Sequence, residues 1–159
     1  MDQRFETIRW TDAGVVLIDQ RRLPEEEVYL TCREPEEVVE AIRTMAIRGA
    51  PAIGVAAAMG LALGALRAAG GDRLEPRFRD LCDRFARSRP TGANLFWAID
   101  RMRGTFEANR GRPPAEVADR LVAEAGRIRD EDVAANRRMG EIGAALLPES
   151  GTVLTHCNA

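Results

Sequence analysis

Residues 49–66 form a run of 18 uncharged residues in a chain in which 30% of the residues are charged. The run reaches the lower limit of length for a membrane span. It is built largely of alanine and glycine, which favour hydrocarbon less than leucine or phenylalanine do, and no second such run follows. Small residues also suit close helix packing. We therefore expect a buried central helix, around which the rest of the chain must pack.

The composition excludes several classes of function. The 159 residues are enough for one domain with a hydrophobic core. The net charge of −2 offers no field that would attract nucleic acid or an anionic membrane. Lysine is absent, which excludes Schiff-base and P-loop lysine chemistry. A single histidine excludes a His-rich metal site and a mechanism with two histidines.

The three cysteines, Cys32, Cys82 and Cys157, lie far apart and form no CxxC pair. Such a set indicates a reducing compartment rather than a disulfide framework. The first ten residues lack the apolar segment of a signal peptide, so we expect a cytoplasmic protein.

The first thirty residues predict a small antiparallel sheet. Strands are expected at 6–10 and 14–19, on either side of a turn at 11–14, and a third at 28–30. Helices should follow, since apolar residues recur at helical spacing. They are expected from Pro35 to a stop at Gly49 with Met45 on the inner face, from Pro51 to Gly70, around 78–85, from Pro90–Thr91, and from 117 to 146.

Residues 151–159 predict a buried strand running into a tight turn, which is how a doubly wound α/β domain begins. The expected fold class is therefore α+β. A small antiparallel sheet and a mainly helical N-terminal domain (1–148) would be followed by the first strand of a truncated Rossmann-like domain (149–159).

Three further features have mainly structural interpretations. Phe96, Trp97 and Phe106 are spaced as core residues, and residues 127–132 predict a solvated face. Asn136 lies in an alanine-rich stretch, and two interpretations stay open: it points into a polar site, or it is a surface residue.

The corner Arg48-Gly49-Ala50-Pro51 lies between two predicted helices. The residue before a proline avoids the helical region, and a glycine can adopt positive φ. The amides that begin the second helix can then point at one spot beside a guanidinium, which suits a phosphate. A plain helix–helix corner with a capping glycine is the alternative.

The sequence Arg89-Pro90-Thr91 repeats this pattern, with an arginine before a helix that starts at proline and a threonine able to cap it. Alone it could be a solvated arginine. Two such corners together favour one polyanionic ligand that touches both.

Cys157 ends the last predicted strand, where open α/β sheets bind ligands and where a following helix would favour the thiolate. We expect a functional role for this thiol, whereas Cys32 and Cys82 are expected to be small buried hydrophobes. His156 is adjacent on the strand and should face the other way, so a Cys–His dyad is not expected.

Three motifs together resemble the S-methyl-5-thioribose-1-phosphate isomerase family: residues 48–54 (RGAPAIG), 89–98 (RPTGANLFWA) and 154–159 (LTHCNA). Residues 17–20 (LIDQ), Leu23-Pro24 and the segment 128–136 resemble it too. Gly92-Ala93 departs from the more usual Ala-Val.

The resemblance implies a cofactor-independent aldose–ketose isomerase of methionine salvage, cytoplasmic and a homodimer when complete. It also implies substrate contacts at Arg48, Gly49, Ala50 and Arg89, and a catalytic role for Cys157. The acid–base aspartate of the family would lie in a second domain. Two relatives of that family stay open: ribose-1,5-bisphosphate isomerase, and the regulatory subunits of eukaryotic translation initiation factor 2B, which are not enzymes.

Overall fold

The computed structural model describes residues 6–71 and 73–154. It begins with a three-stranded antiparallel sheet of order β1-β2-β3, formed by β1 (Ile8–Thr11), β2 (Gly14–Ile18) and β3 (Tyr29–Cys32). β2 is the central strand and is buried throughout, because its β-branched residues pack on the helices. Gly14 has φ +132° in the β1–β2 turn, where a Cβ would lie 2.1 Å from the carbonyl oxygen of Cys32. The predicted sheet is confirmed.

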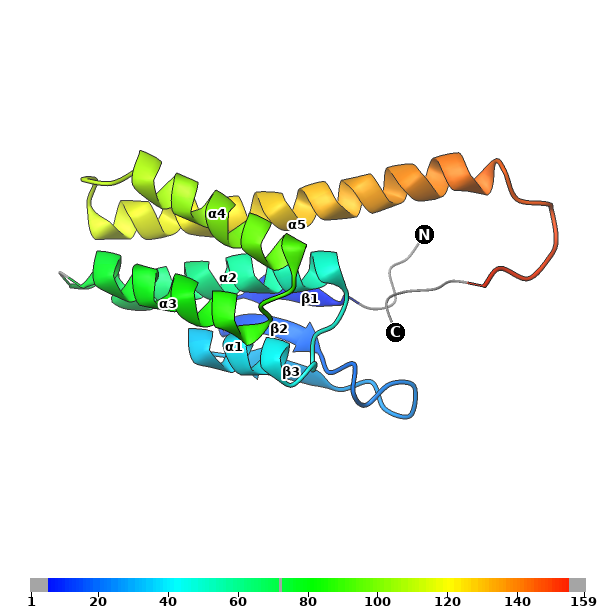
Figure 1. The fold of residues 1–159 in the computed structure, drawn as a ribbon, viewed down its shortest axis with the longest axis horizontal. Helices are drawn as coiled ribbons and strands as arrows, with labels where there is room; N and C mark the ends of the chain where they lie inside the picture. Colours follow the sequence, from blue (N-terminus) through cyan, green and yellow to red (C-terminus); the bar gives the residue numbers. More distant parts are fainter. Residues whose placement is uncertain (1–5, 72, 155–159) are drawn as a thin grey trace.

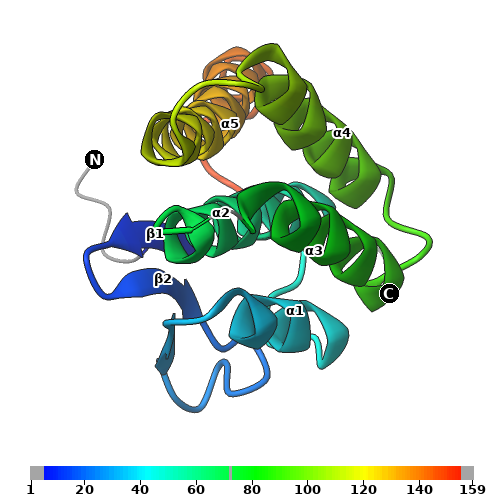
Figure 2. The same ribbon diagram turned by 90° about the vertical axis from the view of Figure 1, so that its left-hand side faces the viewer.

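Five helices follow: α1 (Pro35–Arg43), α2 (Ala50–Ala68), α3 (Leu74–Ser88), α4 (Ala93–Ala108) and α5 (Pro114–Ala144). α2 is the central element, with the sheet and α1 on one side and α4 and α5 on the other, while α3 lies alongside (Figure 1, Figure 2). By length and composition α2 could cross a membrane, but 72% of its 18-residue apolar window is buried inside the fold. The expected buried central helix is confirmed.

The first helix ends earlier than predicted. α1 stops at Arg43 rather than Gly49, because Met45 takes φ 58°, which no α-helix accommodates. Met45 is therefore 48% exposed rather than inward-facing. In the turn that follows, the side chains of Ala46 and Ile47 are buried, whereas Arg48 at the end of the turn is exposed.

The long fifth helix packs on the bundle only along its first half. Its buried residues end at Ile128, and the second half extends beyond the other helices (Figure 1). Met139 and Ile142 continue the apolar spacing but are 62% and 54% exposed.

The strand expected from residue 151 is not formed in the described residues 151–154, where Leu154 is 93% exposed. A strand needs a neighbour for its hydrogen bonds, and no described strand lies beside this segment. Residues 155–159, which carry His156 and Cys157, lie outside the described residues.

Candidate anion-binding site

A cavity of about 620 Å³ separates the start of α2 from the turn that leads into α4. It brings together four of the residues that the sequence analysis singled out: Arg48, Gly49, Ala50 and Arg89. The full lining is Gln20, Arg48, Gly49, Ala50, Ile53, Arg89, Thr91, Gly92, Ala93, Asn94 and Leu95.

The first wall is the N-terminus of α2. Gly49 has φ 92°, a conformation that favours glycine, and its carbonyl accepts the first helical bond from Ile53 N–H at 2.9 Å. No side chain caps this helix, and among the described residues no acceptor is found for the N–H groups of Gly49 and Ala50. Such free amides at the positive end of a helix dipole are an anion-binding arrangement. Because α1 has already ended, Gly49 is not a capping glycine of that helix.

The second wall is the turn after α3. Gly92 N–H donates to Arg89 O at 3.1 Å, so Pro90 and Thr91 occupy the middle of a turn. α4 consequently begins at Ala93, and its N-cap is Gly92 without a side-chain cap. The expectation that Pro90–Thr91 starts the helix, with Thr91 capping it, is therefore wrong. Thr91 lines the cavity instead.

The charged side chains that line the cavity, those of Arg48 and Arg89, are both positive. Among the residues that the structure describes, its lining holds two guanidinium groups and no carboxylate. Most arginines of this chain form ion pairs, but within residues 6–71 and 73–154 no carboxylate lies within 4.0 Å of Arg48 or Arg89. Two guanidiniums and free helix-terminal amides can hold a phosphate through charge-assisted hydrogen bonds.

Two polar residues of the lining, Gln20 and Asn94, had no predicted role. Gln20 follows β2 and donates from Nε2 to Arg48 O at 3.1 Å, while Asn94 projects from the first turn of α4. Both belong to segments of the family resemblance, 17–20 and 89–98, which was the only signal for them. Neither residue type alone indicates a site.

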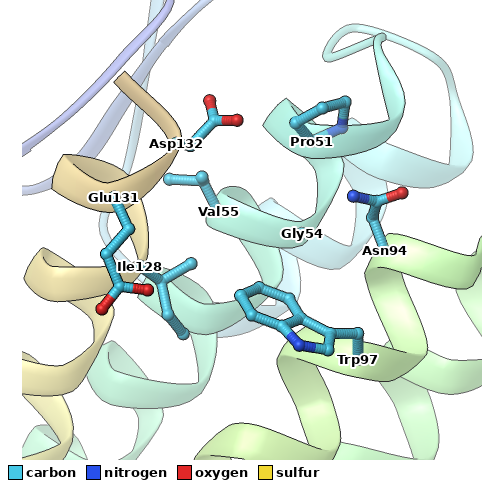
Figure 3. A pocket seen from close by; sticks show the side chains of 8 residues that line it. All are labelled: Pro51, Gly54, Val55, Asn94, Trp97, Ile128, Glu131 and Asp132. Carbon is cyan, nitrogen blue, oxygen red and sulfur yellow. The ribbon is translucent and has the colours of Figure 1, made fainter. Parts of the chain in front are cut away.

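A smaller cavity of about 370 Å³ lies between α2, α4 and α5, and shares Asn94 with the first (Figure 3). Trp97 forms one wall and is 50% exposed, and Phe96 is 38% exposed, so the prediction that both are core residues is wrong. Phe106 is buried as predicted and stacks on Phe78 with ring centroids 4.6 Å apart. The Arg101 guanidinium covers the Trp97 ring, 5.4 Å from its centroid.

The segment 127–132, which was predicted to be a solvated face, is only partly exposed to solvent. Ile128 is buried and lines this smaller cavity with Glu131 and Asp132. Asn136, for which two interpretations were open, is an exposed residue whose Nδ2 donates to the Asp132 carbonyl oxygen at 2.8 Å.

Cys32 and Cys82 are buried free thiols, as predicted. Burial raises the pKa of each to about 11, so both are protonated at neutral pH. Cys157, the thiol for which a role was predicted, lies outside the described residues.

The sequence is similar to proteins of known activity. It is 52% identical over 157 residues to the methylthioribose-1-phosphate isomerase of Koribacter versatilis, and 54% identical over 158 residues to that of Geobacter sulfurreducens. These alignments cover 98% of this chain but 44% and 45% of the relatives. The chain thus spans about half the length of the curated relatives it matches.

The fold is similar to solved structures with two different names. A crystal structure of 5-methylthioribose 1-phosphate isomerase from Pyrococcus horikoshii superposes with a TM-score of 0.88 at 40% identity, covering 100% of this chain and 48% of that one. The translation initiation factor eIF-2B subunit delta from A. fulgidus gives 0.86 at 41% identity, covering 98% and 45%. The family model described as the initiation factor 2 subunit family matches residues 46–159. By sequence and by fold, the chain belongs to the initiation factor 2 subunit family.

Proposed function

We propose that this chain is the N-terminal part of a methylthioribose-1-phosphate isomerase, which converts S-methyl-5-thioribose 1-phosphate to S-methyl-5-thioribulose 1-phosphate in methionine salvage. The observation that carries the proposal is the cavity that Arg48 and Arg89 line together with the start of α2, where the described residues contribute no carboxylate and leave helix-terminal amides free. The names of the similar proteins support it.

In this proposal the cavity holds the phosphate end of the substrate. Arg48 and Arg89 would donate charge-assisted hydrogen bonds to its oxygens, and the N–H groups of Gly49 and Ala50 would complete the site. A phosphate held in this way fixes C1 of the sugar, so that C1 and C2 stand in one place for the reaction.

The reaction is an internal redox exchange and needs no outside oxidant. An acid protonates the ring oxygen as its bond to C1 breaks, and the hydrogen on C2 is moved to C1. The C2 hydroxyl gives its proton to a base as it becomes a carbonyl, which balances the proton that the acid supplied. The phosphate on the anomeric oxygen prevents spontaneous ring opening, which is why the acid is required. The transferred hydrogen could travel as a proton or as a hydride.

The reacting groups belong to the region beyond the described residues. Cys157 is proposed as the catalytic thiol, at the end of a strand that would form once the whole Rossmann-like domain from residue 149 is present, with residues 1–148 as the first domain. The acid–base aspartate of this family is proposed to lie in that second domain, so the 159-residue chain alone should lack turnover. The complete protein is proposed to be a cytoplasmic homodimer that binds a sugar phosphate, without a cofactor and without nucleic acid or membrane partners.

A second candidate is a non-catalytic regulatory role, favoured by the similarity to the eIF-2B delta subunit from A. fulgidus. Ribose-1,5-bisphosphate isomerase is a variant of the first proposal. A bisphosphate would need a second cationic pocket, and the smaller cavity beside Trp97 is lined by Glu131 and Asp132 instead. The described residues of this smaller cavity therefore supply no second cationic pocket.

The test is an isomerase assay on the full-length product of the gene, with methylthioribose 1-phosphate and ribose 1,5-bisphosphate offered separately. Arg48→Lys and Arg89→Lys should each raise KM for the sugar phosphate about tenfold or more, since an ammonium lacks the bidentate geometry of a guanidinium. Arg87→Lys, an exposed position outside the cavity, is the control.

Cys157→Ser should abolish turnover in the same assay while leaving the fold intact. If the unmodified protein turns over neither substrate, the regulatory role gains support. Unchanged KM in both arginine variants would show that the phosphate site has been misplaced.

A further inference from the structure

We propose that Gln20 is a positioning residue for the anion site, because its side-chain amide fixes the Arg48–Gly49 peptide whose N–H belongs to that site. The identity of the anion as a sugar phosphate rests on the proposed function, whereas the positioning itself rests on the contacts described below.

Gln20 contacts the turn before α2 at two points. Its backbone N–H donates to Ala46 O at 2.8 Å, and its Nε2 donates to Arg48 O at 3.1 Å. The residue therefore connects the end of β2 to a turn 28 positions later in the chain. It also lines the same cavity as Arg48 and Gly49.

Gln20 is itself held firmly. Its neighbour Asp19 is 4% exposed and accepts two hydrogen bonds from the Arg21 guanidinium, each at 2.7 Å. Asp19 Oδ1 also accepts the Arg21 backbone N–H at 3.2 Å, and Asp19 N–H donates to Val28 O at 2.8 Å. These bonds fix the backbone on both sides of Gln20, so its side chain projects from a rigid base.

The turn that Gln20 contacts is bonded to α1 through the N–H groups of Met45 and Ile47, but among the described residues no acceptor is found for the N–H groups of Arg48 and Gly49. Met45 and Gly49, at its two ends, both have positive φ, and Arg48 between them is exposed. A bond to the Arg48 carbonyl is therefore an effective constraint on the turn. The peptide group is planar and trans, so its C=O and N–H point in opposite directions. Fixing the carbonyl of Arg48 thus fixes the direction of Gly49 N–H.

The same bond also strengthens Gly49 N–H as a donor. A carbonyl that accepts a hydrogen bond polarises its peptide group, and the N–H of that group becomes a better donor. Gln20 would therefore act on the anion through the backbone, without contact to it. No other described side chain donates a hydrogen bond to Arg48 O.

The test uses the full-length product of the gene and two ligands, inorganic phosphate and methylthioribose 1-phosphate. Gln20→Met keeps the length of the side chain and removes the donor. We expect the Kd for phosphate and the KM for the sugar phosphate to rise about three- to tenfold, with a smaller change in kcat. The amide resonance of Gly49 should shift in the free variant, and phosphate should move it less than in the unmodified protein.

Two comparison variants separate positioning from simple loss of structure. Asn109→Ala removes a similar amide-to-carbonyl bond, Nδ2 to Thr105 O at 2.8 Å, outside the cavity, and should change neither Kd nor the Gly49 resonance. Gln20→Glu replaces the donor by a carboxylate that repels both Arg48 O and the anion, so it should weaken phosphate binding more than Gln20→Met does.

The outcomes distinguish this inference from the proposed function. If Gln20→Met leaves the Gly49 resonance and the Kd for phosphate unchanged, the positioning role is overturned while isomerase activity can still stand. If phosphate binds at Gly49 and depends on Gln20 but no isomerase activity is found, the positioning role stands and the proposed function fails. A Gly49 resonance that does not respond to phosphate in the unmodified protein overturns the inference.

Discussion

Single glycines set how closely the elements pack on α2. A Cβ at Gly60 would lie 2.3 Å from Cζ of Phe85, and one at Gly54 would lie 2.9 Å from the Asn94 carbonyl oxygen. The first contact brings α3 onto α2. The second brings the start of α4, with its cavity residues, against the helix that offers its amides to the anion. The spacing of the site thus depends on residues that have no side chain.

Gly60→Ala tests this packing. The added methyl group overlaps a Phe85 ring that is completely buried, so the ring or the helix must move. We expect a loss of about 1–3 kcal/mol in the free energy of unfolding, measured by urea denaturation.

Gly104→Ala is the control, because a Cβ there meets nothing within 4 Å in the middle of α4. It should stabilise the protein by about 0.5–1 kcal/mol through helix propensity. If the Gly60→Ala variant were as stable as the control, α2 and α3 would be packed less tightly than the contact between Gly60 and Phe85 indicates.

At the scale of elements, one buried carboxylate joins α4 to α5. Glu124 is 7% exposed and accepts hydrogen bonds from Arg101 of α4 and Arg127 of α5. The Arg101 guanidinium also donates a hydrogen bond to the Glu131 carboxylate of α5. Burial by itself raises the pKa of the Glu124 carboxyl, but the two guanidiniums outweigh it and hold that pKa below its usual value. Removing one partner would leave a buried charge unpaired.

This link should make the contact between α4 and α5 sensitive to acid. The pKa of Glu124 is lower in the folded state, so its contribution is complete above the unfolded value of about 4.3 and is lost as pH falls through the folded value. Glu124→Gln should cost about 1.5–3 kcal/mol at pH 7 and should lose less further stability than the unmodified chain at pH 3. Urea denaturation at both pH values measures this.

The matched variant is Glu141→Gln, at an exposed pair with Arg138. It should be nearly neutral at both pH values, since exposed pairs contribute little. If Glu124→Gln and the unmodified chain lose the same free energy of unfolding between pH 7 and pH 3, then carboxylates other than Glu124 cause the loss of stability in acid.

At the scale of the whole molecule, the spacing of apolar residues and the positions of proline and glycine predicted the sheet, the helices and the buried position of α2. Apolar spacing and proline or glycine boundaries are local properties, and the fold follows most of them, although the boundaries expected at Gly49 and Pro90 were wrong. The errors occur where tertiary contacts override local pattern. Met45 leaves its helix through a positive φ, and Trp97 has core spacing but faces a cavity.

The site could be predicted only in part. The two arginine corners were predicted from local pattern, an arginine close before a proline, although at the second corner the proline lies in a turn and not at the start of α4. Gln20 could not be, since its role depends on a bond across the fold to Arg48 O. Nothing in the local sequence indicates which carbonyl a glutamine will contact.

The overhang of α5 has a thermodynamic consequence for the helix itself. Beyond Ile128 no α5 residue is buried, so apart from the ion pair of Glu131 with Arg101 of α4 the second half of the helix depends mainly on its own backbone bonds. Isolated helices of about 12–15 residues are marginal in water, and Gly140 and Gly143 each lower helix propensity further. The two halves of one continuous helix thus differ: packing fixes the first, and the second extends an already formed helix with little tertiary support of its own.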